Sequence, residues 1–112
     1  MPELGDIYKI RIFFKGTFGT YKSRPVLVLE YDNDNCLIAE ITSIPPKNPP
    51  GYYDLVKEKI NDWEKYNLDK LSYVKCKNVY YIENSRLYEK IGSMKDTDEF
   101  RYIVSKIYEY NS

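Results

Sequence analysis

Two short stretches of the chain hold side chains that could act together on a phosphodiester. Arg24 precedes Pro25 and a run of four aliphatic residues, and Thr42 with Ser43 ends the next apolar stretch. Residues 32–35 have the composition of a tight turn. A hairpin closed by that turn brings Arg24 and Thr42 to the same end of two paired strands. An arginine fork binds the non-bridging oxygens of a phosphate, and a neighbouring hydroxyl can hold the same group.

A flexible, partly aromatic loop is predicted just before Arg24. Residues 15–23 contain two glycines among Thr, Tyr and Ser, a composition typical of a loop. Phe18 and Tyr21 could stack on splayed nucleobases. Only four of the 17 basic residues are Arg. The use of Arg rather than Lys at position 24 indicates that the planar guanidinium is required there. A plainer interpretation stays open, in which Arg24 is solvated and the Thr-Ser pair only bonds local backbone groups.

The composition excludes several other classes of catalytic site. His is absent, which removes imidazole bases, the Ser-His and Cys-His systems and imidazole metal ligands. Cys36 and Cys76 lie too far apart in sequence for a CxxC pair, so we expect reduced thiols in the core. We therefore expect neither a metal nor a cofactor. Asp54 and Asp62 could serve as acid–base groups, although exposed, solvated carboxylates are the simpler interpretation.

Charge is balanced overall but uneven along the chain. The 17 basic and 17 acidic residues give zero net charge, so no basic field surrounds the whole molecule. Residues 9–24 hold five basic side chains and no acid, whereas residues 30–40 hold four acids and no base. These runs are either solvated faces or a local phosphate-binding stripe. Since neither a signal peptide nor a membrane-spanning stretch is recognisable, we expect a cytoplasmic protein without membrane contact.

Apolar periodicity predicts a single, mainly β domain over residues 1–112. Alternation and short apolar runs predict strands at 7–14, 25–31, 36–43, 52–56, 72–82 and 86–91. Four prolines in residues 44–51 predict a semi-rigid surface loop. Residues 61–68 predict a short helical turn anchored by Trp63.

The period changes near the end of the chain. Residues 100, 103, 104 and 107 form the apolar stripe of an amphipathic helix. Asp96 and Glu99 have the spacing of a capping pair at the start of this helix. Strands, a small helical insert, further strands and a terminal helix together favour a small closed barrel with a helix packed on it.

Six short motifs follow one another at spacings that resemble a known family. They are GDIY at 5–8, RPVLVL at 24–29, ITS at 41–43, DW at 62–63, LSYVKC at 71–76 and IGSM at 91–94. Their order resembles the MazF/PemK family of type II toxin–antitoxin toxins over nearly the full chain. The resemblance implies a mainly β (α+β) fold: a small SH3-like or CcdB-like barrel with a short helical insert and a C-terminal helix. It also implies a homodimer that is inhibited by a cognate antitoxin.

The same resemblance implies an activity and a set of site residues. The activity is metal-independent, sequence-specific cleavage of single-stranded RNA to 2′,3′-cyclic phosphate and 5′-OH ends. The family's catalytic Arg and Thr match Arg24 and Thr42. The candidate RNA contacts are Thr17, Phe18, Thr20, Tyr21, Lys22 and Ser43.

One departure and two alternatives accompany this interpretation. Many family members carry an acidic residue in the loop before the Arg-Pro pair, and residues 16–23 of this chain have none. The first alternative is a toxin of the same fold that acts by binding a protein, as a gyrase inhibitor does. The second is an inactive relative retained as a binding module.

Overall fold

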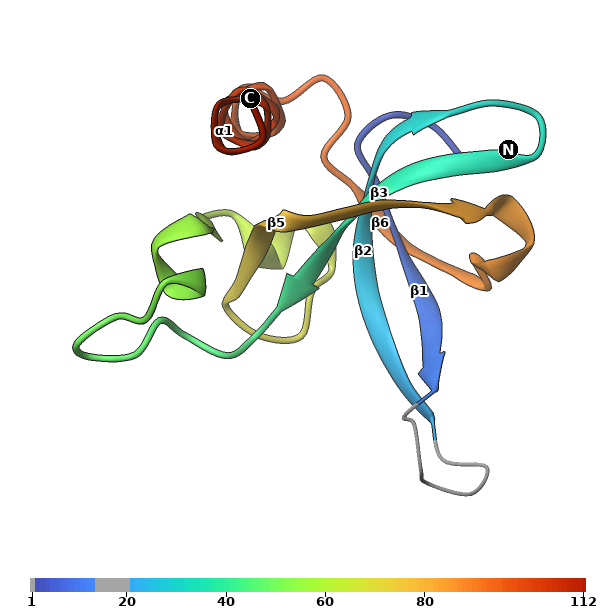
Figure 1. Cartoon of the computed structure of the whole chain (residues 1–112). Helices are drawn as coiled ribbons and strands as arrows, with labels where there is room; N and C mark the ends of the chain where they lie inside the picture. Colours follow the sequence, from blue (N-terminus) through green and yellow to red (C-terminus); the bar gives the residue numbers. More distant parts are fainter. Residues whose placement is uncertain (1, 14–20) are drawn as a thin grey trace.

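The computed structural model describes residues 2–13 and 21–112. Figure 1 shows the arrangement of the helices and strands. In chain order the elements are β1 (Asp6–Phe13), β2 (Tyr21–Tyr31), β3 (Asn35–Thr42), the 3-10 turn η1 (Tyr53–Val56), β4 (Lys57–Ile60), the 3-10 turn η2 (Trp63–Tyr66), β5 (Ser72–Glu83), the 3-10 turn η3 (Asn84–Arg86), β6 (Glu89–Ser93) and α1 (Asp98–Tyr110).

The predicted mainly β fold is confirmed. The six strands form one antiparallel sheet in the order β4-β5-β3-β2-β1-β6, curled into a half-barrel whose two edges are β4 and β6. Three register shifts interrupt the sheet and contribute to the curl. They lie between Ile7 and Tyr8 in the β1–β6 pair, between Val28 and Glu30 in the β2–β3 pair and between Ala39 and Ile41 in the β3–β5 pair. An extra residue at such a bulge bends its strand and increases the local twist. No helix in the described part of the chain is long and apolar enough to cross a membrane.

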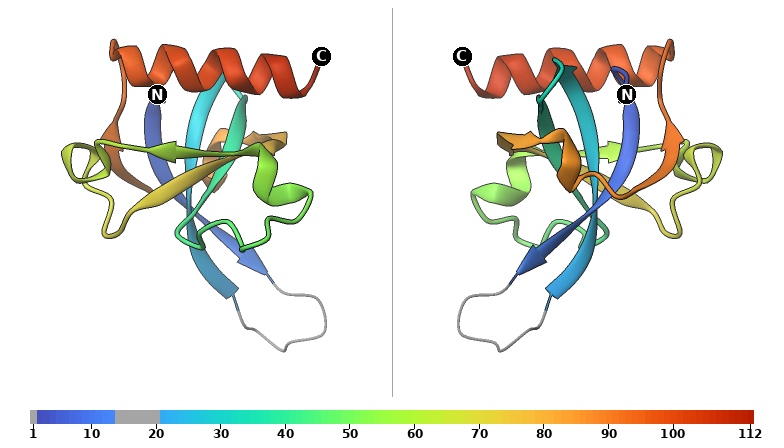
Figure 2. Two further views of the ribbon diagram at one scale, coloured as in Figure 1. Left: turned by 90° about the vertical axis from the view of Figure 1, so that its left-hand side faces the viewer. Right: turned by 90° about the vertical axis from the view of Figure 1, so that its right-hand side faces the viewer.

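The C-terminal helix lies across one end of the sheet, opposite the far ends of β1 and β2 (Figure 2). The helix is confirmed, but the predicted capping pair is wrong. Thr97 is the N-cap, and its hydroxyl accepts the Phe100 N–H at 3.0 Å. Asp96 has a left-handed backbone with φ 61° and lies outside the helix. Glu99 instead accepts the backbone N–H of Asn61 at 2.6 Å, which ties α1 to the insert before η2.

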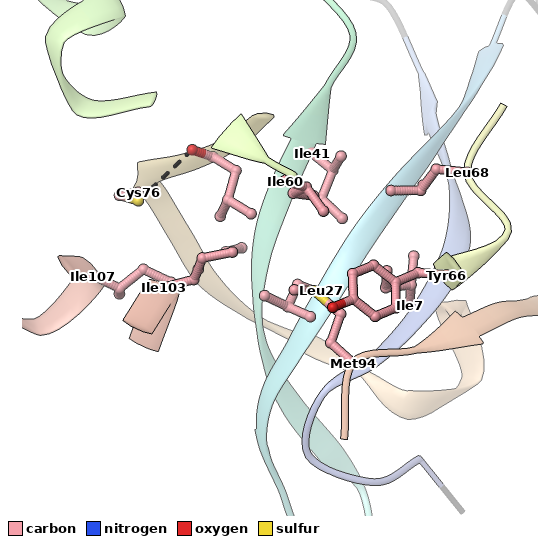
Figure 3. Close-up of a cluster of buried hydrophobic side chains, with 12 residues drawn as sticks. Ile7, Leu27, Ile41, Ile60, Tyr66, Leu68, Cys76, Met94, Ile103 and Ile107 are labelled. Atoms are coloured by element: carbon pink, nitrogen blue, oxygen red, sulfur yellow. Dashed lines mark hydrogen bonds between the residues drawn. The ribbon is translucent and has the colours of Figure 1, made fainter. Parts of the chain in front are cut away.

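A large core, which we call the helix-side core, fills the space between α1 and the sheet. Figure 3 shows Ile103 and Ile107 of α1 directed into this core. Trp63 packs at its margin, as predicted for an anchor of the insert. The buried residues of the helix-side core are Ile7, Leu27, Ala39, Ile41, Ile60, Tyr66, Leu68, Val74, Cys76, Met94, Ile103 and Ile107.

A smaller, second core lies on the other face of the sheet. It consists of Ile10, Val26, Val28, Cys36, Ile38 and Ile82. Successive residues of a strand point to opposite faces, which is why Val26 and Val28 belong to the second core while Leu27 belongs to the helix-side core. Both cysteines are free and buried, one in each core, as the sequence predicted.

Three predicted strand limits are corrected by the structure. The segment predicted as a strand at 52–56 is mostly the turn η1, and the strand β4 begins only at Lys57. The last strand begins at Glu89 rather than residue 86, because η3 occupies residues up to Arg86. Strand β2 begins at Tyr21, so Pro25 lies inside it. Its missing N–H is tolerated there because β3 pairs with β2 only from Val26 onward.

One glycine lets β6 pass close to the insert. A Cβ at Gly92 would stand 2.2 Å from the backbone oxygen of Tyr66. A side chain at this position is therefore sterically forbidden, and the packing of β6 against η2 requires a glycine. The glycine in the motif at residues 91–94 is thus explained by packing.

Candidate functional site

Arg24 and Thr42 lie on the same face of the sheet, at the end where the β2–β3 ladder stops. The last pair of that ladder is Val26 with Glu40. Two residues back along β2 is Arg24, and two residues on along β3 is Thr42. Because alternate residues of a strand share a face, both side chains are placed beside the second core. The predicted juxtaposition follows from this register, whereas the catalytic roles of the two residues stay predictions.

The hydroxyl of Thr42 is held by its own chain. Thr42 is only 7% exposed, and its Oγ1 accepts the backbone N–H of Ile44 at 3.1 Å. This bond occupies an acceptor site and leaves the O–H of Thr42 available as a donor. Local backbone bonding is the alternative role expected for this residue from its place at a strand end. The structure shows that bond, and it is compatible with donation to a ligand.

The segment that follows Thr42 is fixed by a shielded ion pair. Lys57 Nζ contacts the backbone oxygen of Ile44 at 3.3 Å and Asp54 Oδ1 at 3.0 Å. Asp54 Oδ2 accepts the Gly51 N–H at 2.9 Å. The backbone bond from Gly51 and the bond from Lys57 lower the pKa of Asp54 to about 2. The interpretation of Asp54 as an exposed carboxylate is therefore wrong, because its side chain is 8% exposed and fully engaged.

A second polar cluster shares the face of Arg24 and Thr42. Glu40 Oε2 accepts the hydroxyl of Tyr80 at 2.5 Å, and Glu40 Oε1 lies 3.6 Å from Lys75 Nζ. Burial, and then the bond to Glu40, raise the pKa of Tyr80 well above its usual value, so this hydroxyl stays protonated. This cluster is not among the residues predicted from the sequence. Glu40 stands two residues before Thr42 in a predicted strand, and that alternation was the available signal.

A polar cavity of about 500 Å³ adjoins the opposite side of the same strands. Arg24 and Ser43 both contribute to its wall, together with Ser23, Ser72 and Lys9. Ser43 is exposed immediately after β3. Two predicted site residues, Arg24 and Ser43, therefore share a cavity with the hydroxyls of Ser23 and Ser72, which the sequence did not single out.

The basic run at residues 9–24 is divided between two faces by the β1–β2 pairing. Lys9 lies opposite Pro25, whereas Ile10 lies opposite Arg24. Lys9 therefore projects to the face opposite Arg24, and it pairs there with Glu89 at 3.4 Å. On the same face as Lys9, the Arg11 guanidinium stacks 4.4 Å from the centroid of the Tyr88 ring. Lys22 lies on the Arg24 face, opposite Ile12. The four basic residues of this run that the structure describes are thus divided between the two faces and do not form one continuous stripe.

The remaining predicted contacts are only partly within the described residues. Thr17, Phe18 and Thr20 lie outside them. Tyr21 is the first residue of β2, and Lys22 next to it is exposed. Among residues 2–13 and 21–112, no three His, Cys, Asp or Glu side chains are grouped as a metal-binding cluster.

Comparison with known proteins places this chain in a family. A search of curated proteins finds no significant match. The Mycobacterium tuberculosis toxin MazF-mt6 is similar in structure, with a TM-score of 0.63 and 19% sequence identity over 93% of this chain and 96% of that chain. An endoribonuclease solved in complex with its cognate antitoxin, from a mycobacterial species, gives a TM-score of 0.63 and 12% identity over 96% of this chain and 93% of that chain. Residues 3–109 match the family described as PemK-like, MazF-like toxins of type II toxin–antitoxin systems, and the chain belongs to that family.

Proposed function

We propose that the chain is an endoribonuclease that cleaves single-stranded RNA at the face carrying Arg24 and Thr42. The observation that supports the proposal is the register of β2 and β3: Val26 lies opposite Glu40, so Arg24 and Thr42 fall on one face beyond the end of the ladder. The family match supports a toxin, and one similar structure is that of an endoribonuclease. The same-fold alternative of a gyrase-type protein binder predicts no RNA cleavage.

The proposed reaction is an intramolecular transesterification. The ribose 2′-hydroxyl attacks the adjacent phosphorus, and the P–O5′ bond breaks to leave a 2′,3′-cyclic phosphate and a 5′-hydroxyl. Arg24 neutralises charge that develops on the phosphoryl oxygens, which is how a positioned donor contributes most to such a step. Arg24 does not transfer protons, because a guanidinium does not lose its proton in proteins.

Thr42 and Ser43 have supporting roles in this proposal. The O–H of Thr42 donates to a phosphoryl oxygen, while its lone pair is kept by the Ile44 N–H. Ser43 is exposed directly after Thr42, in the wall of a cavity to which Arg24 also contributes, and is proposed as a further RNA contact. Thr17, Phe18, Thr20, Tyr21 and Lys22 are proposed as further RNA contacts. No metal or cofactor has a part in the reaction, which takes place in the cytoplasm.

The decisive test is incubation of the purified protein with a long RNA in excess EDTA, followed by mapping of the product ends. We expect cleavage at a short recurring sequence, with cyclic phosphate on one product and a 5′-hydroxyl on the other. Activity that appears only after a divalent metal is added would refute the mechanism. Intact RNA together with inhibition of a DNA topoisomerase would favour the protein-binding alternative.

We also propose a homodimer that binds a cognate antitoxin. The solved complex of a similar endoribonuclease with its antitoxin supports the partner. Exposed aromatic side chains, including Tyr81 on β5 and Tyr108 on α1, provide apolar surface for protein contacts. Sedimentation at micromolar concentration should give twice the 13.4 kDa mass of the chain. A monomer under those conditions would contradict the dimer.

A further inference from the structure

The transesterification requires a base for the 2′-hydroxyl, and the arrangement of β3 presents one carboxylate at the right place. Glu40 lies opposite Val26, and Val26 is two residues after Arg24 on β2. Glu40 is also two residues before Thr42 on β3. Arg24, Glu40 and Thr42 therefore occupy one face, with Glu40 diagonal to Arg24. Diagonal neighbours across an antiparallel pair lie roughly 7–8 Å apart at the backbone, a separation that a phosphodiester and its ribose hydroxyl can bridge.

The carboxylate of Glu40 is held in a fixed orientation yet keeps acceptor capacity. Tyr80 donates to Oε2 at 2.5 Å, and the Lys75 ammonium lies 3.6 Å from Oε1. An ionised carboxylate has about four lone-pair sites, so these two partners leave others for a substrate hydroxyl. The Glu40 side chain is 20% exposed, which gives solvent and substrate access to it.

The other nearby carboxylates are poorly placed for this task. Asp54 binds Gly51 and Lys57 with its two oxygens, in the segment after Thr42. Glu89 pairs with Lys9, which the strand register places on the opposite face from Arg24. Among these three acids, Glu40 thus combines a fixed orientation, remaining acceptor capacity and the correct face.

We infer that Glu40 is the general base of the proposed RNA cleavage, with Tyr80 and Lys75 as its positioning residues. The inference rests on the proposed function. Glu40 takes the proton from the 2′-hydroxyl as the O2′–P bond forms. The P–O5′ bond breaks, and the departing 5′-oxygen takes a proton from water. Protonated Glu40 then returns its proton to solvent, so the reaction neither consumes nor releases a net proton.

The surroundings of Glu40 complement the negative charge of its carboxylate. Lys75 from β5 lies 3.6 Å from Oε1, and Tyr80 from β5 supplies a hydroxyl that stays protonated and donates to Oε2. From β2, Arg24 and Lys22 add positive charge on the same face. A general base acts in its unprotonated form, so a reaction that depends on one should slow at acid pH.

The test compares Glu40→Gln with the parent in single-turnover cleavage of one RNA across the acid and neutral range. Glutamine keeps the size of the side chain and an oxygen acceptor for Tyr80 but cannot take a proton. We expect a rate loss of about 10²–10⁴, the usual contribution of a general base, and loss of the acid limb of the pH profile. Binding of a non-cleavable 2′-deoxy oligonucleotide should change less than threefold, since the variant removes a proton acceptor rather than a substrate contact.

Glu109→Gln is the matched control, because it removes the acid of the Lys106–Glu109 pair on α1, away from the Arg24 face and from the cavity beside it. We expect it to retain the parental rate and profile. Should Glu40→Gln not fold by circular dichroism, Glu40→Asp decides the question. If residue 40 is the catalytic base, Glu40→Asp should still show an acid limb but cleave at least tenfold more slowly. If Glu40 is only structural, the folded Glu40→Asp protein should cleave at the parental rate.

The outcomes separate this inference from the proposed function. If the parent cleaves RNA and folded Glu40→Gln cleaves with the same rate and pH profile, Glu40 is only a packing residue and the inference is overturned. If the parent cleaves no RNA in EDTA, the proposed function itself fails and Glu40 has no reaction to serve. Equal losses in Glu40→Gln and Glu109→Gln would also overturn the inference, because the effect would then not depend on the Arg24 face.

Discussion

The two faces of the β2–β3 hairpin are built from the same two strands but have different roles, one in the core and one in the candidate site. On one face, Leu27 and Ala39 pair directly and contribute to the helix-side core beneath α1. On the other, Val26 begins a smaller core and the strand end carries Arg24, Glu40 and Thr42. A slip of one residue would exchange the two sets. The helix-side core therefore does more than stabilise the fold, since it fixes the register that brings the polar residues together.

The ion pairs on the two faces differ in the same way. The Lys75–Glu40 side chains are 32% and 20% exposed, whereas those of Lys9 and Glu89 are 38% and 56% exposed. Exposed pairs contribute about 0–1 kcal/mol to stability because water and salt screen them. The more shielded pair lies on the face of Arg24 and Thr42, and the more solvated pair lies on the other face of the same strands. Mutations that separate activity from stability should sharpen this contrast.

The largest expected effect is on cleavage by Arg24→Ala. Removal of a charge aimed at the transition state should reduce the single-turnover rate by roughly 10²–10³, with the fold intact by circular dichroism. Arg24→Lys should recover little, because an ammonium cannot hold two phosphoryl oxygens in the fork geometry. A folded Arg24→Ala protein that cuts RNA as fast as the parent would identify Arg24 as a solvated strand residue.

Thr42→Ala, measured in the same experiment, should lose less activity than Arg24→Ala. A neutral hydroxyl makes a weaker hydrogen bond than a charged group does. Thr42→Ser, which keeps the hydroxyl, is the control. A serine variant as impaired as the alanine variant would show that the methyl group of Thr42, rather than its hydroxyl, is what the site requires.

On the helix-side face the expected effect is on stability. Ile103 is fully buried on the inner face of α1. Ile103→Ala should lower the free energy of unfolding by about 2–5 kcal/mol, because it loses buried apolar surface and leaves a cavity. Urea denaturation measures this loss, and Val104→Ala, at a half-buried neighbour on α1, should lose less. The cleavage rate of the folded Ile103→Ala protein should stay close to that of the parent. A large rate loss without unfolding would break the division between the two faces.

The smallest expected effect concerns the Asp54–Lys57 pair and depends on pH. The folded-state pKa of Asp54 is about 2, below the ordinary value near 4. A lowered folded pKa stabilises the fold above the unfolded-state pKa, and this contribution is lost as the pH falls from about 4 to 2. Asp54→Asn should therefore lower the urea midpoint at neutral pH, with a difference from the parent that shrinks towards pH 2. A difference independent of pH would show that the charge of Asp54 does not stabilise the loop.

The strand pattern was predictable where one face of a strand is buried by a continuous core. Alternation located the first strand, the Asp-Asn turn located the β2–β3 hairpin, and the apolar stripe located α1. The segment at 52–56 was misassigned because its aromatic residues favour strands locally, whereas Asp54 caps Gly51 and turns the chain. The helix start was misassigned because both Asp96 and Thr97 can cap, and the left-handed backbone of Asp96 is visible only in the structure.

The candidate site was predictable only in part. Arg24 and Thr42 could be paired because both lie on one hairpin, whose register follows from its turn. Tyr80 and Lys75 could not be placed beside Glu40 from sequence, because that contact depends on the register shift between β3 and β5. The requirement for Gly92 was likewise hidden, since it arises from the approach of Tyr66, a residue far away in the chain.

The two cysteines give each core its own chemical reporter. Cys36 is buried in the second core and Cys76 in the helix-side core. Burial raises the pKa of the Cys36 thiol, and it raises that of Cys76 to about 12, so neither thiolate is populated while its core stays closed. Alkylation of each thiol therefore requires local opening of its surroundings. The relative rates at which the two thiols react thus measure how independently the two faces of the sheet open, without a probe being added to the protein.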